Sequence, residues 1–124
     1  MPRTMLTVVA LALLLCSESK AQTNLPGTEI RRLVSGQSAS WVRADGQYSG
    51  TITYHRDGRL TSEVKVMGRP MSLSGTWEVL GDRFCRTISL DPVPTRCQKV
   101  VPVSGRTFRF VNEDGSLATT TSFR

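Results

Sequence analysis

The sequence predicts an all-β fold, a small antiparallel barrel or sandwich of about eight strands with one short N-terminal helix. Three observations support this prediction. Apolar and polar residues alternate with a period of two from Gln47 onward. Asp-Gly and Gly-Asp pairs punctuate the alternating segments at short, regular intervals. Helical periodicity is absent after Gly36. Many short strands joined by tight turns are typical of small barrels and sandwiches.

Residues 1–21 have the composition of a cleaved secretory signal peptide. Arg3 supplies a positive charge, an apolar run extends from Met5 to Cys16, and the segment ends in Ser19-Lys20-Ala21. The apolar run is too short for an ordinary membrane span. An alternative is lipidation of Cys16, but a bulky Leu15 precedes that cysteine instead of a small residue. We therefore expect a periplasmic or secreted protein with a single β-rich domain over residues 22–124.

Removal of residues 1–21 would leave a basic chain with a net charge of about +5, rich in arginine. A basic surface favours anionic partners such as lipopolysaccharide, phospholipid or acidic protein. The simpler interpretation is that the positive charge only keeps the domain soluble. Nucleic acid is an unlikely partner, because the aromatic residues that would stack on bases are expected to be buried.

The first expected element is a helix over residues 28–34. Thr28 is suited to cap it, and Glu29 suits its first turn. Ile30, Leu33 and Val34 form an apolar face, and a glycine at position 36 can close the helix. The strands are then expected at residues 40–44, 47–54, 60–66, 71–79, 83–90, 96–103, 106–112 and 116–123.

The turn at Arg56-Asp57-Gly58 sets the register of the clearest hairpin. A two-residue loop would place the apolar faces of the two strands on opposite sides. A three-residue loop with Gly58 left-handed sets Tyr54 opposite Leu60, and the apolar faces then agree. We expect the same geometry at Gly115, where the Asp-Gly step recurs. Two positions remain ambiguous: Phe84 and Cys85 both favour burial although they are adjacent, and Pro102 marks an edge or a bulge.

Cys85 and Cys97 are the two cysteines outside the signal peptide, and an exported protein would bridge them. They lie on consecutive predicted strands and would close a loop of 13 residues. Loop-closure entropy makes such a bridge worth about 3 kcal/mol.

Catalytic patterns are weak in this chain. His55 is the single histidine and lies beside a turn, so neither a catalytic triad nor a metal cluster is indicated. The glycines are scattered and form no phosphate-binding loop. We expect no enzyme activity, no metal and no cofactor.

Two groups of residues are candidates for binding. The first is aromatic and would either fill the core or line a ligand cavity; it consists of Trp41, Tyr48, Tyr54, Trp77, Phe108 and Phe110. The second is basic and would either be dispersed in solvent or form an anion-binding rim at the strand ends; it consists of Arg43, Arg56, Arg59 and Arg83.

The order of the motifs resembles a group of small exported alphaproteobacterial proteins of unknown function. Those proteins share an Asp-Gly turn, then Gly-Thr-Trp, then Gly-Asp-x-[Leu/Phe]-Cys and a second Cys. The corresponding residues here are Asp57-Gly58, Gly75-Thr76-Trp77, Gly81-Asp82-Arg83-Phe84-Cys85 and Cys97. The resemblance implies an exported β-rich domain with a structural disulfide and no known activity. Gly75-Thr76-Trp77 is also similar to the Gly-x-Trp of lipocalin-like (calycin) barrels, which carry it on their first strand.

The sequence therefore favours an exported, non-enzymatic binding domain. One hypothesis is a small amphipathic or anionic ligand held in an open cavity between the strands. The alternative is a protein-interaction module, such as an inhibitor or accessory protein of an envelope enzyme, with a filled interior and an exposed loop or edge.

Overall fold

The computed structural model describes residues 23–89 and 93–124. The predicted signal peptide, Cys16 and the predicted end of the fifth strand at Leu90 lie outside the described residues. The described chain forms a closed antiparallel barrel in which each strand pairs with its sequence neighbours and β8 returns to β1. The barrel confirms the all-β prediction and decides it against a sandwich. The elements are α1 (Gly27–Val34), β1 (Ser38–Arg43), β2 (Tyr48–Tyr54), β3 (Arg59–Val66), β4 (Arg69–Leu80), β5 (Arg83–Thr87), β6 (Thr95–Ser104), β7 (Thr107–Asn112) and β8 (Leu117–Phe123).

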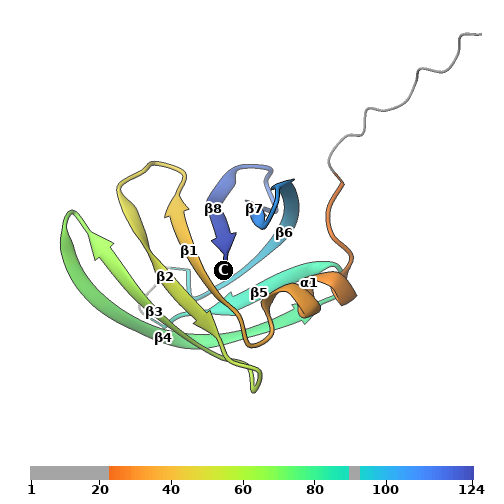
Figure 1. Ribbon diagram of the computed structural model, residues 1–124, viewed down its shortest axis with the longest axis horizontal. Helices are drawn as coiled ribbons and strands as arrows, with labels where there is room; N and C mark the ends of the chain where they lie inside the picture. The colour runs from red at the N-terminus through yellow and green to blue at the C-terminus, as the bar shows by residue number, and fades with distance from the viewer. Residues whose placement is uncertain (1–22, 90–92) are drawn as a thin grey trace, which may run out of the picture.

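Consecutive turns of this barrel alternate between its two ends, because every strand runs antiparallel to its neighbours. The helix end carries the turns β2–β3, β4–β5 and β6–β7 together with α1. The far end carries the turns β1–β2, β3–β4 and β7–β8 and the connection from β5 to β6. In Figure 1, α1 (orange) lies at the right and the β3–β4 hairpin (green) reaches to the left.

The helix α1 is capped by a residue distant in sequence. Pro26 occupies the N-cap position and offers no side-chain hydrogen bond, so the prediction that Thr28 caps the helix is wrong. The backbone N–H of Gly27 instead donates to Asp82 Oδ1 in the β4–β5 turn, at 2.8 Å. Ile30 and Val34 are fully buried and pack on the core cluster. Gly36 closes the helix with a φ of 74°, as expected.

The β2–β3 turn has the predicted three-residue geometry. Tyr54 is opposite Leu60, and Gly58 has a φ of 96°. The N–H of Gly58 donates to the carbonyl oxygen of His55, and the N–H of His55 donates to the carbonyl oxygen of Arg59. The β7–β8 turn repeats this pattern, with Gly115 at a φ of 91°. Both turns hold their Asp by the same bond, which the backbone N–H two residues further on donates.

The two ambiguities of the sequence are resolved by the pairing. Phe84 points into the core, whereas Cys85 lies on the opposite face directly across from Cys97, to which it is disulfide-bonded. Cys85 is buried, and Cys97 is partly buried. Pro102 marks a register shift between β6 and β7, which is the bulge alternative, because a closed barrel gives β6 neighbours on both sides.

Candidate functional site

The lower interior of the barrel, toward the helix end, is filled by aromatic rings. The Tyr54 and Phe84 rings have centroids 5.4 Å apart, as do those of Phe84 and Phe110, and both pairs meet edge to face. Trp77 stacks on Phe84, with the centroids 6.3 Å apart. Such contacts are worth about 0.5–1.5 kcal/mol each beyond the burial of area. Four of the six aromatic candidates are therefore core residues: Tyr54, Trp77, Phe108 and Phe110.

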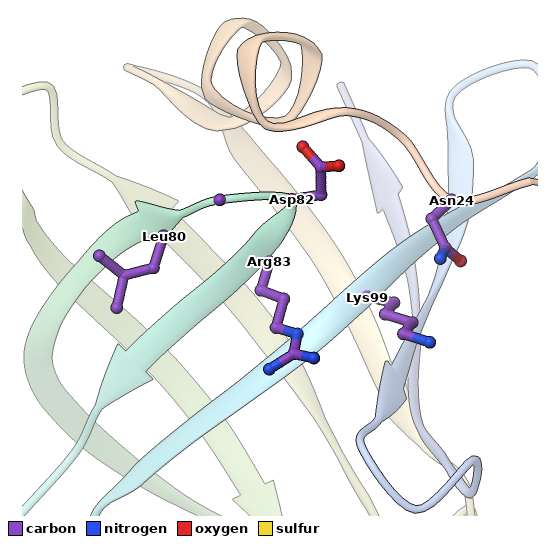
Figure 2. Close-up of a pocket in the computed structure, with 6 residues that line it drawn as sticks. Asn24, Leu80, Asp82, Arg83 and Lys99 are labelled. Atoms are coloured by element: carbon purple, nitrogen blue, oxygen red, sulfur yellow. The ribbon is translucent and has the colours of Figure 1, made fainter.

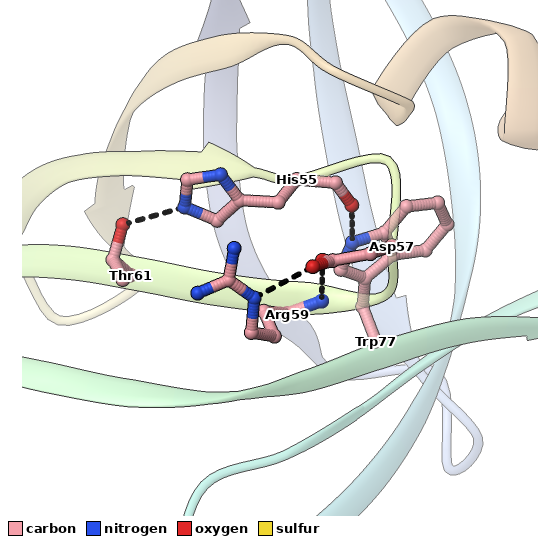
Figure 3. A network of polar contacts seen from close by, with 5 residues as sticks. All are labelled: His55, Asp57, Arg59, Thr61 and Trp77. Atoms are coloured by element: carbon pink, nitrogen blue, oxygen red, sulfur yellow. Dashed lines mark hydrogen bonds and ion pairs between the residues drawn. The ribbon is translucent and has the colours of Figure 1, made fainter.

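Trp77 is held by the β2–β3 turn as well as by the core (Figure 3). Its Nε1 donates to the carbonyl oxygen of His55 at 2.8 Å. The same turn is braced by Asp57, which accepts hydrogen bonds from the backbone N–H and the Nε of Arg59. The imidazole of His55 contacts Thr61 Oγ1 at 3.2 Å. His55 therefore supports a structural turn, and its contacts do not assemble catalytic machinery.

The other two aromatic candidates lie toward the far end and are only half-buried. Trp41 packs against the edge of the core, and its Nε1 donates to the Oγ of buried Ser62 at 3.3 Å. The guanidinium of Arg43 lies over the ring of Tyr48, 3.6 Å from its centroid. Trp41 and Tyr48 are thus the aromatic residues that a ligand at the far end would meet.

The four arginines of the predicted rim are not brought together. Arg43 lies at the far end and pairs with Asp45 at 2.5 Å, whereas Arg56 and Arg59 flank a turn at the helix end. Of the two alternatives, one shared rim is not formed, because Arg43 lies at the end of the barrel opposite to the β2–β3 turn. Arg83 pairs with Glu113 at 2.5 Å. The Arg56 side chain lies against Gly36, where an added Cβ would be 2.8 Å from its Nε.

A shallow hollow of about 360 Å³ lies beside the β4–β5 turn (Figure 2), and two of its polar side chains stabilise the fold. Asp82 faces α1 and accepts the N–H of Gly27, and Arg83 pairs with Glu113. Lys99 lies beside Arg83 in the same hollow. Asp82 therefore caps the helix, and Arg83 links two parts of the barrel wall.

The upper interior, toward the far end, is polar, and the sequence did not predict it. Gln98 is 4 % exposed, and its Nε2 donates to Asn112 Oδ1 at 3.2 Å. The hydroxyls of Thr119 and Thr121 lie 3.0 Å apart, and Thr121 is buried. On each strand these side chains occupy inward positions one or two steps beyond an aromatic or aliphatic core residue. Buried polar side chains that bond one another in this way form a polar layer above the aromatic floor.

Two arginines lie on the inward face at the same level. Arg86 is directly opposite Trp77, and Arg96 is directly opposite Arg86. Residues directly opposite on antiparallel strands project to the same face, so both arginines share the face of buried Trp77. Burial raises the pKa of the Tyr54 phenol far above its ordinary value, and the charge of Arg86 opposes that rise.

A shallow hollow of about 470 Å³ lies beside the far ends of β6 and β7, and Thr95 and Cys97 line it from the outer face of β6. Arg96 and Asn112 contribute to its wall from the inward face, and the β7–β8 turn contributes Glu113 and Asp114. Hydrogen bonds from Ser116 lower the pKa of Asp114. Within residues 23–89 and 93–124 no group of His, Cys, Asp and Glu is arranged to hold a metal ion. The hollow therefore presents one guanidinium and one amide beside the two carboxylates of the turn.

The sequence pattern partly indicates this site. Alternation along residues 96–100 places Arg96, Gln98 and Val100 on one face, and Val100 is an obvious core residue. The alternation on β5 was uninformative, because adjacent Phe84 and Cys85 both favour burial. The inward face of β5, and with it the position of Arg86, could not be assigned from the sequence.

Searches against protein-family models, curated proteins and solved structures find no match to this chain. The helix among the described residues is not long and apolar enough to cross a membrane.

Proposed function

We propose that the protein is an exported, non-enzymatic binding domain that holds the anionic head of a small amphipathic molecule at the far end of the barrel. One observation carries the proposal: Arg86 and Arg96 are directly opposite each other on the inward face, at the level of the polar layer. An anion between or above the two guanidiniums would accept charge-assisted hydrogen bonds from both.

The surroundings of the two arginines suit the rest of such a ligand. The amides of Gln98 and Asn112 would orient a carboxylate or sulfate head, because they lie at the same level of the interior. Half-buried Trp41, Tyr48 and Leu73 line the inward faces of β1, β2 and β4 and would contact an apolar tail. Of the two arginines, Arg96 also lines the hollow of about 470 Å³, a volume within the usual range of small-molecule sites. The aromatic floor limits the ligand to the upper half of the barrel.

Export is part of this proposal. The bonding distance between Cys85 and Cys97 is compatible with an oxidising compartment, and residues 1–21 have the composition of a signal peptide. Fractionation of cells that express the full chain should recover the protein, without residues 1–21, from the periplasm or medium. Recovery of an uncleaved chain from the cytoplasm would contradict export.

Titration calorimetry with decanoate and with decanol tests the ligand class. The two probes share an alkyl chain and differ in the charge of the head, so wild-type protein should bind decanoate more tightly. Replacing both arginines (Arg86→Gln with Arg96→Gln) should weaken decanoate binding about tenfold or more, because a charge-assisted hydrogen bond contributes about 1.5–3 kcal/mol. Decanol binding should change little.

The control is Arg109→Gln, which removes one positive charge from the exposed outer face of β7. It should leave decanoate binding unchanged. Equal affinity for decanoate and decanol, or no binding of either, would overturn the proposal. The second outcome would favour the protein-interaction alternative, which a largely filled interior also fits.

A further inference from the structure

The tip of the β3–β4 hairpin holds an apolar residue in an unusual backbone conformation. Val66 and Arg69 close a two-residue turn of Met67 and Gly68. Met67 is the one non-glycine residue among those described with a positive φ, at 53°. Its side chain is 80 % exposed. A left-handed L-residue is strained, and Asn or Gly is the usual occupant of this turn position. Neither packing nor turn chemistry explains a methionine here, which points to a role outside the fold.

The hairpin extends beyond its neighbour on one side. β4 has 12 residues, but only Thr76 to Leu80 pair with β5. The preceding part, from Arg69 to Gly75, pairs with β3 alone among the described residues. This places the tip at the left limit of the molecule in Figure 1, on the side opposite α1. The tip is thus free to meet a large surface without involving the helix end.

Neighbouring strands add apolar residues at the same end. Met71 on β4 is 46 % exposed, Val42 on β1 is 47 % exposed and Leu117 on β8 is 36 % exposed. The strands β8, β1, β2, β3 and β4 are consecutive in the barrel wall. We call these three residues and Met67 the apolar arc. An arc of separate side chains on one turn and three strands suits a flat, deformable surface better than a single deep pocket.

The charge beside the tip is positive. Lys65 and Arg69 flank Met67, and neither forms an ion pair with a described residue. The nearby carboxylate of Asp45 is engaged by Arg43, and that of Glu63 accepts a hydrogen bond from Ser72. The whole chain carries a net charge of +6. Exposed apolar side chains flanked by cations are the combination by which peripheral proteins bind anionic bilayers.

We propose that the apolar arc docks on an anionic lipid surface, with Met67 inserted among the headgroups and Lys65 and Arg69 against lipid phosphates. The positive φ of Met67 then has a reason, because it directs an apolar side chain outward from a tight turn. The proposal is independent of the ligand site, since none of the three residues belongs to the polar layer.

Vesicle flotation tests the proposal. Wild-type protein should float with vesicles of equal parts phosphatidylglycerol and phosphatidylcholine, and much less with phosphatidylcholine alone. Met67→Asn should lower partitioning about tenfold, because one buried apolar side chain is lost. The fold should survive, since Asn-Gly is a preferred pair for this turn. Replacing both cations (Lys65→Gln with Arg69→Gln) should lower it about twentyfold and remove most of its salt dependence.

The control is Val103→Asn, which changes another exposed apolar side chain (41 %) at the helix end. It should float as wild type does. The proposal fails if wild-type protein does not float with the anionic vesicles, which would leave the tip as a contact for a protein. It also fails if Met67→Asn floats as well as wild type, or if Val103→Asn loses binding to the same extent.

Discussion

The two halves of the barrel interior are built on different chemistry. Toward the helix end, Tyr54, Trp77 and Phe84 meet in close ring contacts under α1. Toward the far end, Gln98 and Asn112 share a hydrogen bond at the level of two inward arginines. The hydrophobic effect acts on the first half, whereas the second half gains little by burial and must satisfy each polar atom. The helix end therefore carries most of the hydrophobic stabilisation, and the far end is where we propose the ligand site.

The two tryptophans give the largest measurable contrast between the halves. Trp77→Ala should cost about 3–5 kcal/mol of unfolding free energy, because it empties the aromatic floor and removes a hydrogen bond to the β2–β3 turn. Trp41→Ala should cost roughly half as much, since Trp41 is half-exposed. Urea denaturation of both variants measures the two costs. Equal costs would show that the far end contributes to stability as much as the aromatic floor does.

Tyr54 provides a pH-dependent test of the half toward the helix end. Burial raises the folded pKa of its phenol above the ordinary value of 10.0. Above pH 10 the unfolded chain therefore releases this proton while the folded protein keeps it, and the free energy of unfolding falls. The contribution is about 1.4 kcal/mol per pH unit until the folded pKa is reached. Below pH 10 both states are protonated, and the effect is absent.

The control for this test is Tyr54→Phe, which removes the proton but retains the ring. Denaturation from pH 9 to 11 should show a steeper decline for wild-type protein than for the variant. Parallel declines would mean that the phenol reaches water in the folded state.

The smallest expected effect is a loss of stability that should be similar in the two halves. Gly58 lies in a turn at the helix end and Gly115 in the equivalent turn at the far end, with φ values of 96° and 91°. Replacing either by Ala should cost about 1 kcal/mol or more, because the strain arises from the backbone conformation. Thermal unfolding of the two variants should show similar losses. A loss at Gly58 alone would mean that the far-end turn relaxes, so that its conformation is not required for stability.

Much of the fold could be predicted from local patterns. The strand alternation, the three-residue turns and the facing cysteines all follow from residues close in sequence, and the structure confirms each of them. The core positions of Trp77 and Phe110 follow from the same alternation. The strain at Met67 was not predicted, because the register of β3 and β4 had to be known before the turn was seen to contain only two residues.

Other features depend on strands that meet only in the closed barrel. The cap that Asp82 provides to Gly27 joins residues 55 positions apart, so no local pattern contains it. The four arginines do not form one rim. The antiparallel order of all eight strands decides at which end of the barrel each turn lies, and a local pattern does not contain that order. Arg86 and Arg96 face each other because the disulfide-bearing strands pair in one register, which directs the cysteines outward and the adjacent residues inward. A period of two separates the faces of a strand, but closure of the barrel decides which face is the interior.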